Sequence, residues 1–291
     1  MAATSSSPGT LLVNGRIFTK GGSGLEGQAE FADSMFVQDS IIKSIGPRDE
    51  LSAKHQHEST HTQNLDGKTV LPGFVDGHIH LLQLGQSLQK LVICQILKEA
   101  RFTAINVLET HTKPGSRHRI EHLEFSAPED AKRLGSLGIT ASIQPVHADP
   151  MILVDWPRLI GTHRCKRAFA YRDFADFGAL LAIGSDTPTA PWDPLKNLYV
   201  ATTRRSARQP EWTTTVNENF RLGLCEAVTA ATLGAAKSVF AEERVGSLEV
   251  GKAADFAGLN LEWDAEKLLG ASVEETWFNG KRVYQNVNTK L

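Results

Sequence analysis

Short runs of alternating apolar and polar residues near both ends of the chain predict small β-structure there. The expected strands lie at residues 11–19, 35–45, 69–71, 246–259 and 274–284. Turn residues interrupt the first two strands, and Asn279-Gly280 in the last strand is a dipeptide typical of a hairpin. Both ends of the chain are therefore expected to be β-rich.

The middle of the chain has a different pattern, in which apolar strand-like runs alternate with helical spacing. Strands are expected at residues 74–80, 119–124, 139–144 and 179–184, a strand followed by a helix at 91–109, and helices at 128–138, 171–178 and 226–240. Strands that alternate with helices favour a parallel α/β architecture.

Composition narrows the class of protein. The 291 residues are 41% hydrophobic and 22% charged, as in a globular protein of one large domain or two modest ones. Thirty-one basic against thirty-three acidic residues leave a net charge of −2, so no basic field favours nucleic acid or an anionic membrane. No apolar run approaches the roughly 18 residues of a membrane-spanning helix. We therefore expect neither a nucleic-acid partner nor a membrane partner.

Cysteine usage indicates a reducing compartment. The chain has three widely spaced cysteines, Cys94, Cys165 and Cys225, and no CxxC pair. An odd, scattered set cannot form a disulfide framework. The first ten residues lack the basic and apolar regions of a secretory signal. A cytoplasmic location is expected.

The candidate chemistry lies where predicted strands end. His78 and His80 stand at i and i+2 at the end of one strand, so that their imidazoles point to the same side. His122 follows a second short strand, and Asp186 follows a third. Because active sites of barrels are built where the carboxyl ends of strands converge, these four residues form a plausible metal site. Imidazoles with one carboxylate suit Zn²⁺, although Fe, Mn and Co remain open.

Six motifs resemble those of the amidohydrolase superfamily and occur in its order. They are LPGFVDGHIHL, RHRIEH, SIQPVH, GSDTP, GSLEVGKAADF and TWFNGKRVY. The resemblance is strongest to the metal-dependent branch that includes N-substituted formamide deformylases. It implies an α/β fold with a TIM-type (β/α)₈ barrel and a small β-sandwich formed by both chain ends. The expected domains are residues 1–72 with 245–291 for the sandwich and 73–244 for the barrel.

The same resemblance implies the roles of the site residues. His78, His80 and His122 would bind the metal, and Asp186 would be metal-associated and serve as the general base. His147 would lie near the substrate. Trp192, six residues after Asp186, is a further candidate to line a substrate pocket, with packing in a core or loop the alternative.

The interval between the first and sixth strands of the barrel is shortened. Only 38 residues separate His80 from Arg119, which suffices for one βαβ unit of about 30 residues and not for four. If residues 95–101 align with a family strand that ends in a metal-binding His, Leu97 replaces that His. The fold expected is thus an incomplete or shortened barrel, which would have to cover an open sheet edge or pair with another copy as a homo-oligomer.

Two functions follow as alternatives. The first is a metal-dependent hydrolase that cleaves carbon-nitrogen bonds other than peptide bonds in a small amide or N-acyl substrate. In this reaction Asp186 would take a proton from water and pass it to the leaving nitrogen. The second is a catalytically impaired relative, either a binding or scaffold protein or the product of a truncated gene.

Other polar clusters are interpreted as structural. The His55, His57 and His61 cluster predicts a solvated loop. Residues 22–27 match GxGxxG but lack a following helix, so we expect a flexible loop. Three arginines at 204, 205 and 208 predict a solvated face.

Overall fold

The computed structural model describes residues 8–80, 98–111, 113 and 115–287. Within these residues the chain divides into two compact units. One unit contains residues 8–22, 28–74 and 240–287, and the other contains residues 23–27 and 75–239. The domain boundaries expected from the sequence stay a prediction.

The first unit is built from two β-sheets. A four-stranded sheet has the order β5-β4-β1-β6, and a six-stranded sheet has the order β13-β12-β11-β7-β2-β3. The strands of the four-stranded sheet are β1 (Gly9–Val13), β4 (Ser34–Gln38), β5 (Ile41–Gly46) and β6 (Ser59–Asn64). Those of the six-stranded sheet are β2 (Arg16–Gly21), β3 (Ala29–Ala32), β7 (Thr69–Pro72), β11 (Phe256–Asn260), β12 (Ser272–Phe278) and β13 (Lys281–Gln285).

Strands from both chain ends join in the six-stranded sheet, because β11 pairs antiparallel with β7 and β7 pairs parallel with β2. A buried apolar cluster that includes Leu12, Ile17, Phe256 and Trp277 draws on both ends of the chain as well. The β-rich ends predicted from the sequence are thus present. Only β11 forms within the expected strand 246–259.

The predicted turns follow from residues that tolerate left-handed backbone. Asn14 has φ 57°, and Asn279 and Gly280 have φ 49° and 70° between β12 and β13. Two consecutive left-handed residues make the turn whose twist matches antiparallel strands. The Asn-Gly hairpin is therefore found where the sequence predicts it.

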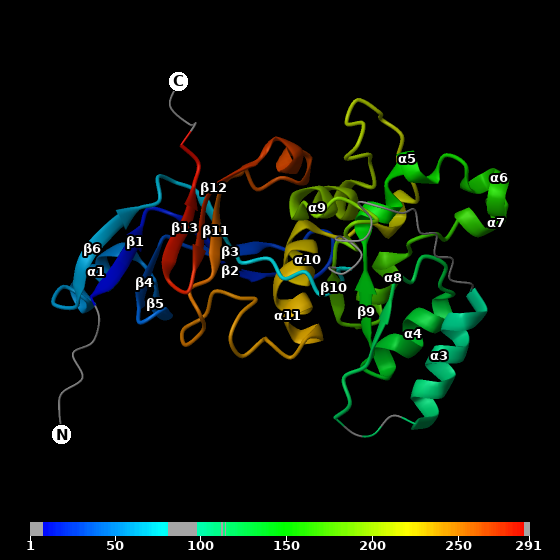
Figure 1. The fold of residues 1–291 in the computed structure, drawn as a ribbon, viewed down its shortest axis with the longest axis horizontal. Coiled ribbons are helices and arrows are strands. Elements are labelled where there is room, and N and C mark those ends of the chain that lie inside the picture. Colours follow the sequence, from blue (N-terminus) through cyan, green and yellow to red (C-terminus); the bar gives the residue numbers. More distant parts are fainter. Residues whose placement is uncertain (1–7, 81–97, 112, 114, 288–291) are drawn as a thin grey trace. The chain divides into compact units, whose positions relative to one another are not determined.

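The second unit contains a parallel sheet of three strands in the order β10-β9-β8 (Figure 1). These strands are β8 (Arg119–Glu121), β9 (Thr140–Ile143) and β10 (Leu181–Ile183). The α-helices are α3 (Lys98–His111), α4 (Pro128–Ser136), α5 (Pro150–Leu153), α6 (Trp156–Ile160), α7 (Thr162–Cys165), α8 (Tyr171–Asp176), α9 (Pro194–Thr203), α10 (Leu224–Thr229) and α11 (Ala235–Ser238). The α/β class is confirmed, but the sheet of the described residues does not close into a barrel.

The expected strand at residues 74–80 is not formed. This segment docks along the end of β10 through isolated backbone contacts instead of a ladder. The Asp186 amide donates to the His78 carbonyl at 2.9 Å, and the His80 amide donates to the Thr187 carbonyl at 2.9 Å. The segment has only a short apolar run and contains Gly77, and the backbone of the neighbouring segment turns away at Asp186 (φ 54°). A continuous parallel ladder therefore does not form.

Two structural interpretations of polar clusters are wrong for particular residues. His55 follows α1 (Arg48–Lys54) and is buried, with its ring stacked on Phe36 at 3.9 Å. Arg204 is fully buried, because three backbone carbonyls accept hydrogen bonds from its guanidinium. Residues 22–27 form a loop as predicted, and the Gly24 amide in it donates to Glu226 at 2.7 Å. The proposed Leu97 replacement lies outside the described residues.

Candidate metal centre

The candidate residues come from the ends of all three strands of the parallel sheet and from the segment docked beside it. His122 directly follows β8. His147 lies in a 3₁₀ turn, η1 (Pro145–Ala148), shortly after β9. Asp186 lies three residues after β10. The carboxyl ends of neighbouring parallel strands meet at one edge, which brings these residues together with His78 and His80.

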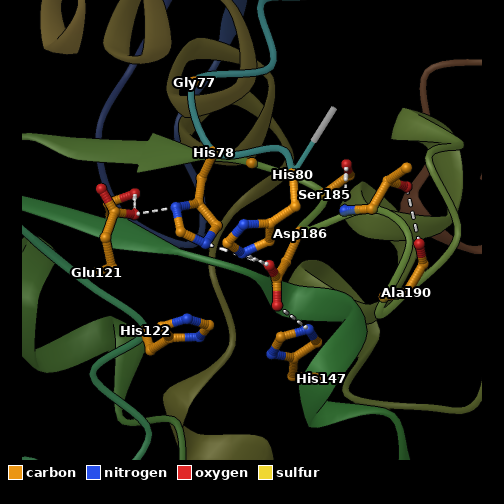
Figure 2. Close-up of polar contacts among 12 residues, drawn as sticks. Gly77, His78, His80, Glu121, His122, His147, Ser185, Asp186 and Ala190 are labelled. Atoms are coloured by element: carbon orange, nitrogen blue, oxygen red, sulfur yellow. Dashed lines mark hydrogen bonds and ion pairs between the residues drawn. The ribbon is translucent and has the colours of Figure 1, made fainter. Parts of the chain in front are cut away.

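Asp186 lies at the centre of the cluster and contacts three of its histidines (Figure 2). Its Oδ1 lies 3.2 Å from His78 Nε2 and 2.8 Å from His80 Nε2. Its Oδ2 lies 3.3 Å from His147 Nε2. One buried carboxylate therefore faces three imidazoles from two different parts of the chain.

A second carboxylate, Glu124, faces the other side of the cluster. Its Oε1 lies 3.1 Å from His122 Nδ1 and 3.7 Å from His147 Nδ1. The rings of His122 and His147 stack with centroids 5.7 Å apart, and those of His78 and His122 meet edge to face at 5.1 Å. Four histidines and two carboxylates thus form one continuous cluster.

Glu121, inside β8, orients His78 from behind. Its Oε2 lies 2.9 Å from His78 Nδ1, and Arg119 and Ser142 also contact this carboxylate. A carboxylate on one ring nitrogen fixes the tautomer of an imidazole and leaves the other nitrogen free to bind a metal. Here that other nitrogen, Nε2, points to Asp186.

Close packing fixes where the His78 segment can lie. A Cβ added at Gly184 would be only 2.7 Å from the His78 Cβ. Asp76 accepts hydrogen bonds from the Ser185 amide at 3.0 Å and the Ser185 hydroxyl at 2.5 Å. Glycine at 184 is therefore required for the segments that carry His78 and Asp186 to approach each other.

The ionisation of the cluster reflects its excess of facing carboxylates. Asp186 and Glu121 raise the pKa of His78 to about 9. Burial lowers the pKa of His147, but Asp186 and Glu124 outweigh this effect and raise it above its ordinary value. Burial favours the neutral form of Asp186, yet His147 and His78 hold the pKa of its carboxyl well below its usual range. Without a cation, His78 therefore keeps its proton at neutral pH.

The residues fit a divalent metal. Among the described residues, three buried atoms of the cluster make no hydrogen bond of acceptable geometry, namely His78 Nε2, His147 Nε2 and Asp186 Oδ1. Ligand atoms of His78, His122 and Asp186 lie within 4.8 Å of one another, as do those of His122, Glu124 and His147. Imidazole nitrogens and carboxylate oxygens are ligands that Zn²⁺ and other first-row divalent ions accept. A cation would satisfy the buried atoms that these contacts leave without a hydrogen bond.

The structure brings together five of the six site residues predicted from the sequence, namely His78, His80, His122, His147 and Asp186. Trp192, the sixth, is 74% exposed. Sequence reasoning missed Glu121 and Glu124. The signal that could have found them is their place next to a predicted site residue, because they lie one residue before and two residues after His122. The assignment of ligand and catalytic roles to these residues stays a prediction.

The amidohydrolase family model matches residues 94–284, which is more than half of the chain. The chain belongs to the amidohydrolase family. Among curated proteins, this amidohydrolase-family chain is 36% identical over 175 residues to LONG AFTER FAR-RED 3 of Arabidopsis thaliana and 30% identical over 188 residues to YtcJ of Bacillus subtilis. These matches cover 58% and 62% of the chain but 29% and 35% of the two relatives, so the chain spans about a third of their length.

Solved structures share the fold of this family member. A metal-dependent hydrolase from Pyrococcus horikoshii OT3 superimposes with a TM-score of 0.69 at 13% identity, over 89% of this chain and 98% of that one. An amidohydrolase from Thermotoga maritima MSB8 gives a TM-score of 0.59 at 12% identity, over 95% and 100% of the two chains. The family resemblance stated from the motifs is thus confirmed, whereas the formamide deformylase branch stays a prediction.

Proposed function

We propose that the chain is a metal-dependent hydrolase that cleaves a carbon-nitrogen bond other than a peptide bond in a small amide or N-acyl substrate. The observation that carries this proposal is the convergence of His78, His80 and His147 on Asp186. Several of the buried nitrogen and oxygen atoms that meet there make no hydrogen bond and could bind a metal. Membership of the amidohydrolase family supports the reaction class. Resemblance to the formamide deformylase motifs supports N-formyl or N-acyl amines as first substrates.

His78, His80, His122 and Asp186 would hold the metal, and we propose Zn²⁺ as the ion because histidines predominate. A bound divalent ion lowers the pKa of a water ligand toward about 7 and polarises a carbonyl oxygen. The protein's own contribution begins with Glu121, which holds the His78 ring so that Nε2 faces the ion. Arg119 holds Glu121 in turn through a 2.7 Å contact.

Asp186 is suited to move the proton. Its Oδ1 faces His78 and His80, whereas its Oδ2 lies on the side of His147. Because the pKa of this carboxyl is held well below its usual range, Asp186 is ionised at neutral pH. The ionised form is the one that can accept a proton from water, although the same low pKa makes it a weaker base. It would then return the proton to the leaving nitrogen, while His147 at 3.3 Å keeps the carboxylate oriented. Trp192, exposed after this segment, stays a predicted substrate contact.

A second candidate function is favoured by the open sheet. The described part of the chain holds a three-stranded sheet in place of a closed barrel, so the walls that usually surround a substrate are incomplete there. The alternative is therefore a relative that binds a ligand or metal without turnover. In this alternative the segment between the first and sixth strands of the family barrel is too short to complete the barrel. Homo-oligomer formation and a cytoplasmic location are further proposals. No helix within the described ranges is long and apolar enough to cross a membrane.

Hydrolysis of a panel of N-formyl and N-acetyl amines by the zinc-loaded protein tests the proposal. Amine release should depend on added metal, and it should fall by at least about a hundredfold in Asp186→Asn, because this change removes the proton acceptor. Asp193→Asn, in the same chain region but outside the cluster, is the matched control. Equal rates for the wild type and Asp186→Asn would refute the proposed hydrolase mechanism, and zinc binding without turnover would favour the alternative.

A further inference from the structure

Gln144, the residue directly after β9, carries a buried carboxamide without a hydrogen-bond partner in the described part of the chain. The residue is only 1% exposed. Among the described residues, neither its Oε1 nor its Nε2 makes a hydrogen bond. A carboxamide accepts at its oxygen and donates two hydrogens from its nitrogen, and buried groups of this kind are normally paired. The side chain is therefore suited to a partner from outside the described chain.

The backbone of Gln144, in contrast, is fully engaged. Its carbonyl accepts from the His147 amide at 2.9 Å and from the hydroxyl of the buried Tyr171 at 3.3 Å. These two contacts fix the point from which the side chain extends. The carboxamide thus belongs to a rigid part of the fold, although its own polar atoms are unpaired among the described residues.

The register of the parallel sheet places Gln144 on the face that His78 occupies. Gln144 and Gly184 are the residues that follow the paired Ile143 and Ile183. Residues at the same level of neighbouring strands direct their Cβ atoms to the same face. A Cβ at Gly184 would lie 2.7 Å from the His78 Cβ, so this face is the one toward His78.

A contact one level lower in β9 agrees with this placement. Ser142 stands two residues before Gln144, and side chains two apart in a strand share a face. The Ser142 hydroxyl donates to Glu121, which in turn contacts His78 at 2.9 Å. Both observations put the unpaired carboxamide of Gln144 on the side of the sheet where the proposed reaction takes place.

The role of this residue differs from that of the surrounding histidines and carboxylates. None of the ion pairs and ring contacts that join those side chains in the described structure involves Gln144. A neutral amide is also not among the usual ligands of Zn²⁺. Gln144 therefore neither holds the metal nor orients a residue that does.

We propose that Gln144 binds the substrate directly, with Oε1 accepting a hydrogen bond from the N–H of the amide that is cleaved. It is then a specificity-determining residue, which selects amides that keep an N–H over esters of the same shape. A site with a buried polar group discriminates strongly against an analogue that leaves this group unpaired. The inference rests on the proposed function, since it takes the carbon-nitrogen bond as the group to be recognised.

The competing explanation is structural. In that case the carboxamide is bonded within the folded chain and only supports the end of β9. Methionine separates the two explanations, because it is unbranched and of similar length but cannot replace the hydrogen bonds of an amide. A structural role predicts a less stable Gln144→Met variant that handles all substrates equally poorly.

The test compares N-butylformamide with butyl formate, in which an oxygen replaces the N–H. For the zinc-loaded Gln144→Met variant we expect kcat/KM for the formamide to fall by at least about tenfold, because the N–H loses its acceptor. The value for the ester should change by less than about twofold. Each compound is compared with itself across variants, so the different reactivities of amide and ester cancel. Gln56→Met, at an exposed position, is the matched control and should change neither value.

Equal losses for both compounds, or no loss for the formamide, would overturn the role of Gln144 and leave the hydrolase proposal standing. If the wild type hydrolyses neither compound, the proposed function fails, and isothermal titration calorimetry of the same pair still decides the inference. Weaker binding of the formamide alone in Gln144→Met would support it. Unchanged or equally weakened binding of both compounds would refute it.

Discussion

Replacing Glu121 by glutamine should weaken zinc binding by about ten- to a hundredfold while the protein stays folded. Glu121 is expected to touch the imidazole of His78 and not the ion. Its Oε2 lies 2.9 Å from His78 Nδ1, so that Nε2 of the same ring is presented to Asp186. Glutamine retains an oxygen that can accept from Nδ1–H, but its uncharged amide supports the ring less strongly.

The size of the effect follows from what the carboxylate does. An ionised acceptor makes a hydrogen bond about twice as strong as a neutral one. A ten- to hundredfold loss of affinity corresponds to about 1.4–2.8 kcal/mol, which is the range expected for losing the charged partner of a metal-binding histidine. Arg119, which lies 2.7 Å from Glu121 Oε1, would lose an ion pair but still donate to the Gly77 carbonyl.

Competition between the protein and a zinc chelator of known affinity measures this change. Glu129→Gln is the matched control, since this glutamate is exposed in the first turn of α4. Unfolding of each variant in the metal-free form separates an effect on the ion from an effect on the fold. Unchanged zinc affinity in a folded Glu121→Gln variant would refute the orienting role of Glu121.

Three further predictions concern the same centre. The pKa of His78 is raised from 6.5 to about 9, so the stability that this residue gives to the metal-free fold is fully present below pH 6.5 and is lost as the pH rises through 9. In urea unfolding, the free energy of unfolding should therefore decline by up to about 3 kcal/mol over this range, and the decline should be absent in His78→Gln. Gly184→Ala should destabilise the protein by about 1–3 kcal/mol in urea unfolding, because the new Cβ would lie 2.7 Å from that of His78. Gly270→Ala is the control and should leave stability unchanged, because the space around Gly270 is open. Equal destabilisation by the two variants would contradict the packing argument. Gln144 is 1% exposed, and its amide atoms have no hydrogen-bond partner among the described residues. Gln144→Met should therefore raise the free energy of unfolding by about 1 kcal/mol. A lower Tm in this variant would show that the amide does make hydrogen bonds.

Much of the candidate centre could be predicted because parallel strands place their last residues at a common edge. His122 and Asp186 follow short predicted strands, and their position at the strand ends indicates that they meet. His78 and His80 reach the same point although their segment forms no strand, since backbone contacts to Asp186 and Thr187 hold it there. For His78 and His80, the sequence correctly predicted the meeting point with Asp186 but not the secondary structure of the segment that carries them.

The parts that could not be predicted depend on contacts between residues far apart in the sequence. Glu121 faces His78 only because β8 lies beside the docked segment, and its role is invisible from spacing within β8. Arg204 is a charged residue in a polar run, but a left-handed backbone (φ 59°) turns it inward, where carbonyls of Ala168, Phe169 and Val216 accept from it. His55 is buried because α1 ends against Phe36. In each case the tertiary partner decides the environment, and local polarity gives the opposite expectation.

The most direct test of the central claim is an anomalous-scattering map of zinc-loaded crystals, collected on both sides of the zinc absorption edge. The account predicts a zinc peak within about 2.0–2.2 Å of ring nitrogens of His78, His80 and His122 and of an Asp186 oxygen. A well-ordered His78, His80 and Asp186 cluster without zinc density, or zinc bound only at other histidines, would contradict it.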